Sequence, residues 1–327
     1  MLSISPEKQE HETSEIINCG LETRKNCPAC ASDNFRTIYE NRFDESPIID
    51  YLLDFYSQRI MADFKYLEGS AYILCECENC RLIFQRDIPN KIFMEKLYGH
   101  WIEPLEHHDQ ETDFSDYASN AQEIMQVISY FGKNPSSLRF FDFGMGLGRW
   151  ALMAKGFECQ SYGTELTEEL IEHAKSNGIK VIAWDEIPQY SFDFINTEQV
   201  FEHIPEPLKT LHHLKKSLKA EGILKISVPP ANDIDRRLKI MDWESPKYSK
   251  NSLNAVAPLE HINCFRRSSI LKMAAEAGMQ EIFMPIKTQY RYTTDWSGIK
   301  RIAKNIFRPI YRNILKKQNY VLLRKMQ

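Results

Sequence analysis

The sequence contains no run of about 18 apolar residues, the length that a membrane-spanning helix requires. Its start, Met1 to Glu15, is acidic and lacks the basic stretch followed by an apolar core that marks a signal peptide. Internal repeats and low-complexity segments are also missing, which argues against a repeat architecture. These absences predict a cytoplasmic protein.

Positive charge is not in excess either. The 327 residues include 41 Lys and Arg against 45 Asp and Glu, which gives a formal net charge of −4. This balance does not favour a protein that coats nucleic acid through its overall field. Between Asn26 and Phe84 there is also no cluster of basic residues beside aromatic ones, so nucleic acid is not an expected partner. With 43% hydrophobic residues, the chain can form two packed domains.

Four of the eight cysteines form two Cys-x-x-Cys pairs, Cys27-Pro28-Ala29-Cys30 and Cys77-Glu78-Asn79-Cys80. Without an export signal, such pairs indicate a metal site rather than disulfides. We expect Cys27, Cys30, Cys77 and Cys80 to bind one structural Zn²⁺, because four sulfur ligands leave no open position for catalysis. Cys75 is an alternative to Cys77. Reduced core thiols or a redox pair are alternatives to zinc.

The sequence divides into four parts: a flexible leader (1–25), a zinc-binding domain (26–100), a helical linker (101–135) and an α/β domain (136–327). The leader carries charge without hydrophobic periodicity. Within the zinc-binding domain, apolar residues between Ser46 and Tyr66 recur at helical spacing and predict a helical insert. Short strands are expected on both sides of the second cysteine pair, at Tyr72–Cys75 and Arg81–Phe84.

From Leu138 onward, strand and helix patterns alternate, which predicts a parallel sheet. The expected strands are Leu138–Phe143, Cys159–Gly163, Lys180–Trp184, Phe192–Asn196 and Ile223–Val228. Helices are expected from Thr167 to Asn177 and from Leu208 to Ala220, since each stops at or just before a glycine. The long mixed segment from Pro229 to Glu260 is interpreted as a lid on the substrate side.

The first strand runs into three alternating glycines, Gly144, Gly146 and Gly148, and then into a helix. Glycines at the carboxyl end of a strand let the backbone approach a nucleotide closely. A dinucleotide fingerprint would need a further glycine at position 149, where Arg149 stands. The turn, with Asp142 and Phe143 before it, is therefore assigned to a different nucleotide-like cofactor.

Two further positions fit a cofactor with a ribose and an adenine. Glu165, followed by Leu166, ends the second strand about 20 residues after the turn, where an acidic side chain accepts ribose hydroxyls. Trp184 and Asp185 end the third strand, where an apolar face and an acceptor would flank adenine. Each piece alone also fits a tight turn, a surface glutamate or a core tryptophan. Their joint order favours the cofactor site.

The segment from Phe192 to Pro207 resembles the fourth-strand signature of class I S-adenosylmethionine-dependent methyltransferases, in which a Glu-His pair opens the next helix. His261-Ile262-Asn263-Cys264-Phe265 is similar to the late motif of that superfamily on the substrate side. The resemblance covers about residues 138 to 285. It implies a Rossmann-like α/β fold with a seven-stranded sheet, whose last two strands, Glu281–Lys287 and Tyr320–Leu323, form an antiparallel edge.

The resemblance also implies S-adenosylmethionine as the cofactor and adds Glu198 and Gln199 to its binding residues. It places His203 and His261 near the methyl donor, and both are candidates for a general base. Some members of the superfamily hold a divalent metal with carboxylates at the end of the fourth strand. Because Gln199 stands among Glu198, Glu202 and His203 here, metal-dependent methylation is not expected.

The two cysteine pairs followed by such a domain resemble bacterial methyltransferases with an N-terminal zinc-binding domain, although Arg81 stands where a glycine is common. That group is linked to the methylation of sugars, surface glycans and secondary metabolites. The resemblance implies an acceptor that is a small molecule or a glycan precursor. An RNA-directed methyltransferase that binds through its zinc module, and a non-catalytic scaffold, are the alternatives.

The segment from Gly298 to Lys317 places five isoleucines on one helical stripe among basic residues, with no acidic residue. One interpretation is a helix that packs its isoleucines on the domain between the last two strands. The other is peripheral contact with the inner face of an anionic membrane.

Overall fold

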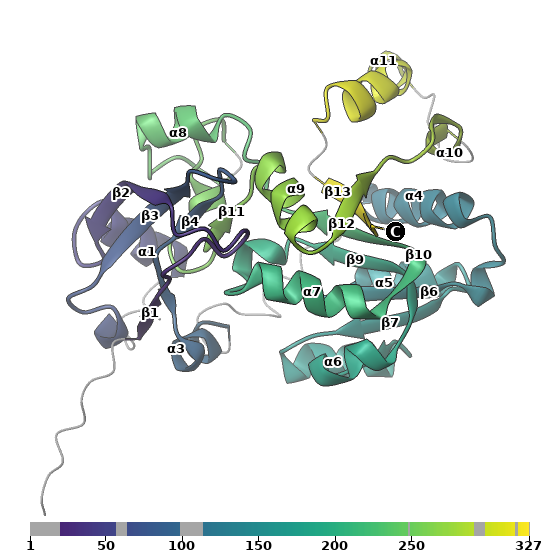
Figure 1. Ribbon diagram of the computed structural model, residues 1–327, viewed down its shortest axis with the longest axis horizontal. Coiled ribbons are helices and arrows are strands. Elements are labelled where there is room, and N and C mark those ends of the chain that lie inside the picture. Colours follow the sequence, from purple (N-terminus) through teal and green to yellow (C-terminus); the bar gives the residue numbers. More distant parts are fainter. Residues whose placement is uncertain are drawn as a thin grey trace, which may run out of the picture.

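The computed structural model describes residues 20–56, 64–98, 114–247, 249–290, 298–317 and 320–326, and the two larger of its three sheets lie at opposite ends of the molecule (Figure 1). A small antiparallel sheet contains the N-terminal strands. A larger sheet of seven strands contains the glycine-rich turn. Among the described residues, no helix is both long and apolar enough to span a bilayer.

The small sheet has the strand order β11-β4-β3-β2. Its strands are β2 (Phe35–Arg42), β3 (Ala71–Cys77), β4 (Ile83–Gln85) and β11 (Asn263–Cys264). Beside it, β1 (Leu21–Thr23) pairs with β5 (Asp87–Pro89), so the predicted leader, 1–25, includes a strand. The helical insert is present as α1 (Ile48–Tyr56) and η1 (Phe64–Tyr66), followed later by α3 (Lys91–Lys96); residues 57–63 of the insert lie outside the described residues.

The large sheet has the order β12-β13-β10-β9-β6-β7-β8, which confirms the predicted seven-stranded α/β fold with an antiparallel edge. Its strands are β6 (Arg139–Phe143), β7 (Gln160–Thr164), β8 (Lys180–Val181), β9 (Phe192–Glu198), β10 (Leu218–Ser227), β12 (Met279–Ile282) and β13 (Tyr320–Lys325).

Three strand boundaries differ from the prediction by more than two residues. The third strand ends at Val181, because Trp184 opens the 3-10 helix η4 (Trp184–Gln189), where the Glu186 carboxylate accepts the N–H of Ala183 at 2.9 Å. The fifth strand begins at Leu218 rather than Ile223, with a bulge between these residues. The predicted strand Glu281–Lys287 ends at Ile282, and its last residues enter the short helix α10 (Ile286–Tyr290).

Helices cover both faces of the large sheet. On one face, α7 (Pro207–Ser217) and α9 (Arg267–Glu276) pack against side chains such as Phe141 and Ile195. On the other, α4 (Phe114–Phe131) and α5 (Arg149–Gly156) pack against Phe140 and Phe194. The remaining elements are η3 (Pro135–Ser137), α6 (Glu168–Ser176), η5 (Phe201–His203), α8 (Ile234–Ile240), η6 (Asn254–Val256), α11 (Ile299–Pro309) and the π-helical turn η7 (Ile310–Ile314).

Two segments pack differently from the predicted division of the chain. The α4 helix, expected to belong to a linker at 101–135, covers the large sheet; residues 101–113 lie outside the described residues. The expected lid, Pro229 to Glu260, contributes Trp243, Leu253 and Val256 to the buried core of the small sheet. Trp243 packs edge-on against Tyr72 of β3, with ring centroids 5.7 Å apart. The lid segment is therefore a structural part of the N-terminal unit.

Candidate functional site

The glycine-rich turn joins β6 to α5 at the carboxyl edge of the large sheet. Gly144, Gly146 and Gly148 all have positive φ angles, of 69°, 52° and 69°, which non-glycine residues adopt only with strain. A Cβ atom at Gly144 would lie 2.8 Å from Val200, and one at Gly148 would lie 2.7 Å from Ile179. A Cβ at Gly146 would meet no atom within 4 Å, so this glycine faces open space.

Glu165 holds this turn from the end of β7. Its carboxylate accepts the backbone N–H of Gly146 at 2.9 Å and that of Leu166 at 2.7 Å. The acidic side chain and the open face of the turn thus lie side by side, as the cofactor prediction requires. Each carboxylate oxygen has a further lone pair for a ribose hydroxyl.

Exposed apolar surface lies close to this pair. Leu166 is 90% exposed directly after Glu165, and Trp184 is 42% exposed at the start of η4. Trp184 stacks on His213 of α7, with centroids 3.9 Å apart, and its ring centroid lies 5.8 Å from that of Phe143. Asp185 is exposed beside it. These residues form an apolar surface with an acceptor, suited to an adenine ring.

Asp142 is placed differently from the other predicted cofactor residues. It is buried on β6, where it accepts a hydrogen bond from the Asn196 amide of β9 at 2.8 Å. Burial raises the pKa of its carboxyl to about 7. The side chain links the two strands below the turn.

Glu198 and Gln199 lie at the carboxyl end of β9. The Glu198 carboxylate accepts the Ser227 hydroxyl at 2.7 Å and pairs with Lys225 at 2.7 Å. Gln199 has a positive φ of 54°, and its backbone N–H donates to the Ser227 carbonyl at 2.9 Å. A strained residue held by the neighbouring strand is typical of functional sites, where it fixes the direction of the chain.

His203 and His261, the two predicted base candidates, are brought together from η5 and from the residues before β11. Their ring centroids lie 4.9 Å apart at 60°. The Nδ1 of His203 donates to the Glu260 carbonyl at 2.9 Å, and the Nδ1 of His261 donates to the Asn254 carbonyl. Because a carbonyl oxygen only accepts, both rings carry their proton on Nδ1 and keep Nε2 as a free acceptor.

Burial sets the charge of this pair. It lowers the pKa of His203 to about 4 and that of His261 to about 4, so both rings are neutral at physiological pH. The adjacent Glu202 is 1% exposed, and burial raises the pKa of its carboxyl to about 8. At pH 7 the cluster is therefore an uncharged group of one carboxylic acid and two imidazoles.

The cluster contains polar atoms without partners. Within the described part of the chain, both carboxyl oxygens of Glu202, the Tyr98 hydroxyl and Oε2 of Glu260 are buried without a hydrogen bond. The Tyr98 ring lies edge-on to His203, with centroids 6.2 Å apart. Unsatisfied buried polar groups are costly, so their convergence marks a place for a polar ligand group. Sequence reasoning missed Tyr98 and Glu260, because no local motif distinguishes them.

The cluster also has the composition of a metal site. One ligand atom from each of Glu202, His203 and His261 lies within 4.8 Å of the others. Two imidazoles held by backbone carbonyls and one carboxylate are a known ligand set for divalent metals. At the end of the fourth strand itself, where metal binding was not expected, Glu198 pairs with Lys225.

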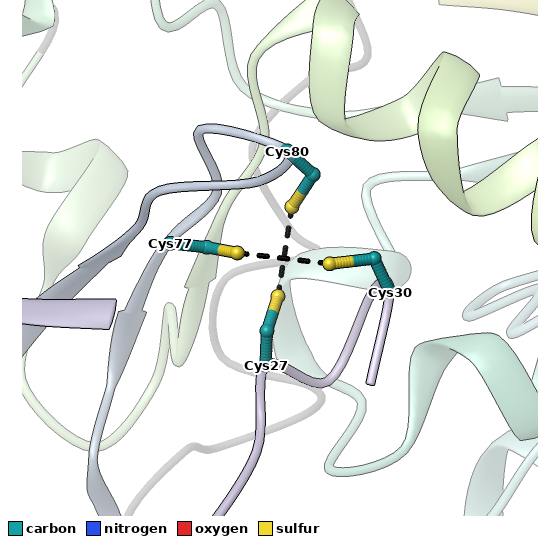
Figure 2. A group of neighbouring side chains, drawn as sticks. All are labelled: Cys27, Cys30, Cys77 and Cys80. Carbon is teal, nitrogen blue, oxygen red and sulfur yellow. Dashed lines mark hydrogen bonds between the residues drawn. The ribbon is translucent and has the colours of Figure 1, made fainter. Parts of the chain in front are cut away.

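Cys27, Cys30, Cys77 and Cys80 converge on a common centre (Figure 2). All four are buried, with sulfur atoms 3.5 Å apart between Cys27 and Cys80 and 3.6 Å apart between Cys30 and Cys77. These separations far exceed a disulfide bond and are close to the edge of about 3.8 Å of a tetrahedron with Zn–S distances of about 2.3 Å. Cys75 lies outside the cluster and contacts the Thr37 hydroxyl at 3.9 Å.

The two cysteine pairs have the same local structure. The N–H of Ala31 donates to the carbonyl of Cys27, and that of Arg81 donates to the carbonyl of Cys77, each at 2.9 Å. Both donors have positive φ angles, of 58° for Ala31 and 67° for Arg81. The left-handed turn explains why glycine is common at the position of Arg81 in similar proteins.

A separate cleft of about 300 Å³ lies where β10 ends and β13 begins. Its lining includes Asp233, Arg266, Arg267 and Lys316. None of the residues predicted to bind the cofactor lines this cleft, so the cofactor site and the cleft are distinct places on the same edge of the sheet.

Comparison with known proteins agrees with the methyltransferase prediction. A family model described as a methyltransferase domain matches residues 117–282, slightly more than half of the 327 residues. The fold and the glycine-rich turn define a Rossmann-like methyltransferase. The chain belongs to the methyltransferase-domain family and is an S-adenosylmethionine-dependent methyltransferase.

Two solved structures are among those similar to this chain. The plantazolicin methyltransferase BpumL, in complex with SAH, is 15% identical, and the match covers 72% of this chain and 94% of that chain with a TM-score of 0.46. A putative sarcosine dimethylglycine methyltransferase from Galdieria sulphuraria is 16% identical, with 68% and 91% covered and a TM-score of 0.41. No curated protein matches the sequence.

Proposed function

We propose that this methyltransferase transfers a methyl group to a protic group, a hydroxyl or an amine, of a small molecule or glycan precursor, and that His203 accepts the displaced proton. The observation that carries the proposal is the buried pair of neutral imidazoles, His203 and His261, whose Nδ1 protons are engaged by backbone carbonyls. Each therefore presents Nε2 as a base that is already deprotonated at neutral pH.

His203 is the better placed of the two. Its side chain is 22% exposed, whereas the whole residue His261 is 7% exposed. We assign proton transfer to His203 and positioning to His261. The unpartnered oxygens of Glu202 and the Tyr98 hydroxyl offer hydrogen bonds to the acceptor. The enclosed position suits a small acceptor or the end of a sugar chain.

The bound donor supplies an activated methyl group on a sulfonium, which leaves by in-line displacement. As the acceptor atom forms its bond to the methyl carbon, Nε2 of His203 takes the proton from that atom, and the carbon–sulfur electron pair returns to sulfur. Positioning contributes most of the remaining acceleration. In our proposal, Glu165 binds the ribose, and Leu166, Trp184 and Asp185 flank the adenine.

We further propose that the four-cysteine cluster holds a structural Zn²⁺. The convergence of the four sulfur atoms, all within 4.8 Å of one another, and their burial support this assignment. Four such ligands leave no open coordination position, so the ion would fold the N-terminal unit rather than take part in methyl transfer.

The test of the base compares His203→Ala with His261→Ala, and uses His212→Ala, an exposed histidine on α7, as the control. SAH release is measured with a panel of nucleotide sugars and hydroxylated or aminated small molecules. We expect His203→Ala to lower turnover by about 10²- to 10⁴-fold with nearly unchanged affinity for S-adenosylmethionine. Near-normal turnover in His203→Ala would exclude His203 as the base.

The pH dependence follows from the direction of the pKa shifts. Because burial lowers the pKa of His203 to about 4, kcat/KM is expected to rise through this pH and to stay level towards neutrality. Above about pH 8, kcat/KM is expected to change a second time, because the Glu202 carboxyl loses its proton there. Loss of activity on treatment with a chelator, with restoration by a divalent ion and without unfolding, would assign Glu202, His203 and His261 to a metal instead.

A further inference from the structure

The helix α11 and the turn η7 are oriented with their polar side towards the domain. Asn305 and Arg308 are buried, while the isoleucines on the opposite side are not. The Arg308 guanidinium donates to the Gln289 carbonyl at 2.8 Å and to the Asn305 side chain. The Tyr290 hydroxyl donates to the Asn305 carbonyl. The interpretation in which the isoleucine stripe packs on the domain is therefore wrong.

Further polar contacts fix this orientation. Arg312 donates to the Gln126 side chain of α4 at 3.3 Å, and Gln289 of α10 donates to the Asn313 side chain at 3.3 Å. Hydrogen bonds to two different helices are directional, so they hold one side of α11 and η7 inward. The apolar side is consequently turned away from the domain, and α11 itself lies on the outside of the molecule (Figure 1).

The outward side is strongly apolar. Ile299 is 86% exposed, Ile306 60% and Ile314 70%. Phe307, Ile310, Tyr311 and Leu315 are also exposed on these two elements. Helical periodicity puts Ile299, Ile306 and Ile310 on one face. A contiguous apolar surface of this kind on a folded protein marks an interaction site.

Basic residues flank this apolar face. Lys300, Arg301, Lys304, Lys316 and Lys317 are exposed, and no acidic residue occurs between Gly298 and Lys317. A second copy of the chain would bring two such positively charged faces together, which electrostatic repulsion opposes. An amphipathic helix with an apolar face and basic flanks fits a surface that combines a hydrocarbon interior with negative charge.

The connection that carries α11 starts and ends at the carboxyl edge of the large sheet. The strand β12 is parallel to β10, since both run antiparallel to β13. The carboxyl end of β12 and the start of β13 therefore meet at the sheet edge that carries the glycine-rich turn. The residues between these two strands, including α11, emerge from that edge.

We propose that the outward face of α11 and η7 binds the surface of an anionic lipid bilayer. This inference goes beyond the proposed function and does not depend on it. The isoleucines and Phe307 would enter the boundary between headgroups and acyl chains, while the lysines contact the lipid phosphates.

The test is co-sedimentation of the full-length protein with vesicles of phosphatidylcholine alone or of equal parts phosphatidylcholine and phosphatidylglycerol. Wild-type protein is expected to sediment with the anionic vesicles and to be released by added salt. Ile306→Asn with Ile314→Asn, two exposed positions, should abolish binding without unfolding. Lys300→Ala with Lys304→Ala should weaken it by about fivefold per lysine removed.

Matched controls are Ile92→Asn on α3, where the isoleucine is 59% exposed, and the exposed Lys216→Ala on α7. Both should bind vesicles like the wild type. Equal recovery with neutral and anionic vesicles, or binding that survives the double isoleucine substitution, would overturn the proposal. A dimer in analytical ultracentrifugation that the isoleucine substitutions dissociate, without any vesicle binding, would assign the face to self-association instead.

Discussion

At the scale of single residues, the site depends on backbone conformations that few residue types accept. The three glycines of the turn have positive φ angles, and so do Gln199, Ala31 and Arg81, which are not glycines. Such residues cost of order 1–2 kcal/mol each and persist where surrounding contacts hold them. Gln199 lies at the predicted methyl-transfer site and the other two lie in the cysteine turns, so both candidate sites include strained positions, although five further non-glycine residues with positive φ angles lie elsewhere in the described residues.

Glu165 contributes to the turn as well as to the predicted ribose contact. Glu165→Ala removes the carboxylate that accepts the N–H groups of Gly146 and Leu166. We expect the affinity for S-adenosylmethionine to fall by about 10- to 100-fold in calorimetric titration, since each lost bond involves a charged acceptor. The fold should remain intact.

The control for this measurement is Glu169→Ala, which removes an exposed carboxylate from the first turn of α6. It should leave cofactor affinity unchanged. Wild-type affinity in Glu165→Ala would show that the turn binds something other than the cofactor.

At the scale of elements, the two cysteine turns have the same hydrogen-bond pattern. In both, the N–H of the first cysteine also donates to a carbonyl five residues later, Cys27 to Ser32 and Cys77 to Leu82. This pattern points two thiols from each turn towards one centre. Cys75, two residues earlier on β3, is paired with Thr37 of β2, and its thiol contacts the Thr37 hydroxyl instead of the cluster.

The metal content of the purified protein tests whether the two cysteine turns bind one zinc ion. The purified protein should contain about one zinc ion per chain, and Cys77→Ser should lose it together with thermal stability, because such sites contribute folding energy directly. Cys75→Ser is the matched control, since it changes a buried cysteine of the same strand and should keep the metal. Full occupancy in Cys77→Ser would contradict the assignment.

At the scale of the whole molecule, a segment from late in the chain joins the two units. The strand β11 adds to the edge of the small sheet, and its Asn263 is fully buried. The Asn263 amide donates to the carbonyls of Phe201 and Ile204, at 3.0 and 2.8 Å, and its oxygen accepts Arg24 at 2.9 Å. The residue thus connects the N-terminal unit to the helix η5 that carries His203.

Asn263→Ala is therefore expected to affect both stability and catalysis. It removes the short hydrogen bonds to two carbonyls, which keep only longer bonds of 3.4 and 3.5 Å, and it removes the side-chain acceptor of Arg24. The free energy of unfolding should therefore fall by about 2–4 kcal/mol in urea denaturation. Turnover should fall by about 10- to 100-fold even under conditions where the protein is folded, because His203 loses its support.

A second variant and a control accompany this measurement. Asn263→Asp keeps the size of the side chain but loses the donor, and it should reproduce most of the effect. Asn34→Ala, at an exposed position, should change the free energy of unfolding by less than about 0.5 kcal/mol. An Asn263→Ala protein with normal stability and turnover would show that the two units do not depend on this contact.

The sequence by itself determined the features that depend on local patterns. The alternation of strands and helices predicted the parallel sheet, the spacing of Gly144, Gly146 and Gly148 predicted the turn, and the two Cys-x-x-Cys pairs predicted a four-sulfur cluster. Each of these depends on residues a few positions apart, where backbone preferences and periodicity are decisive.

Only the tertiary structure decided which distant groups meet. It brought His203 and His261 together with Tyr98, selected Cys77 over Cys75, and placed the expected lid in the core of the small sheet. It also decided which side of α11 faces the domain. The amphipathic pattern alone favours burial of the isoleucines, but directional hydrogen bonds of Arg308 and Arg312 to α10 and α4 hold the polar side inward.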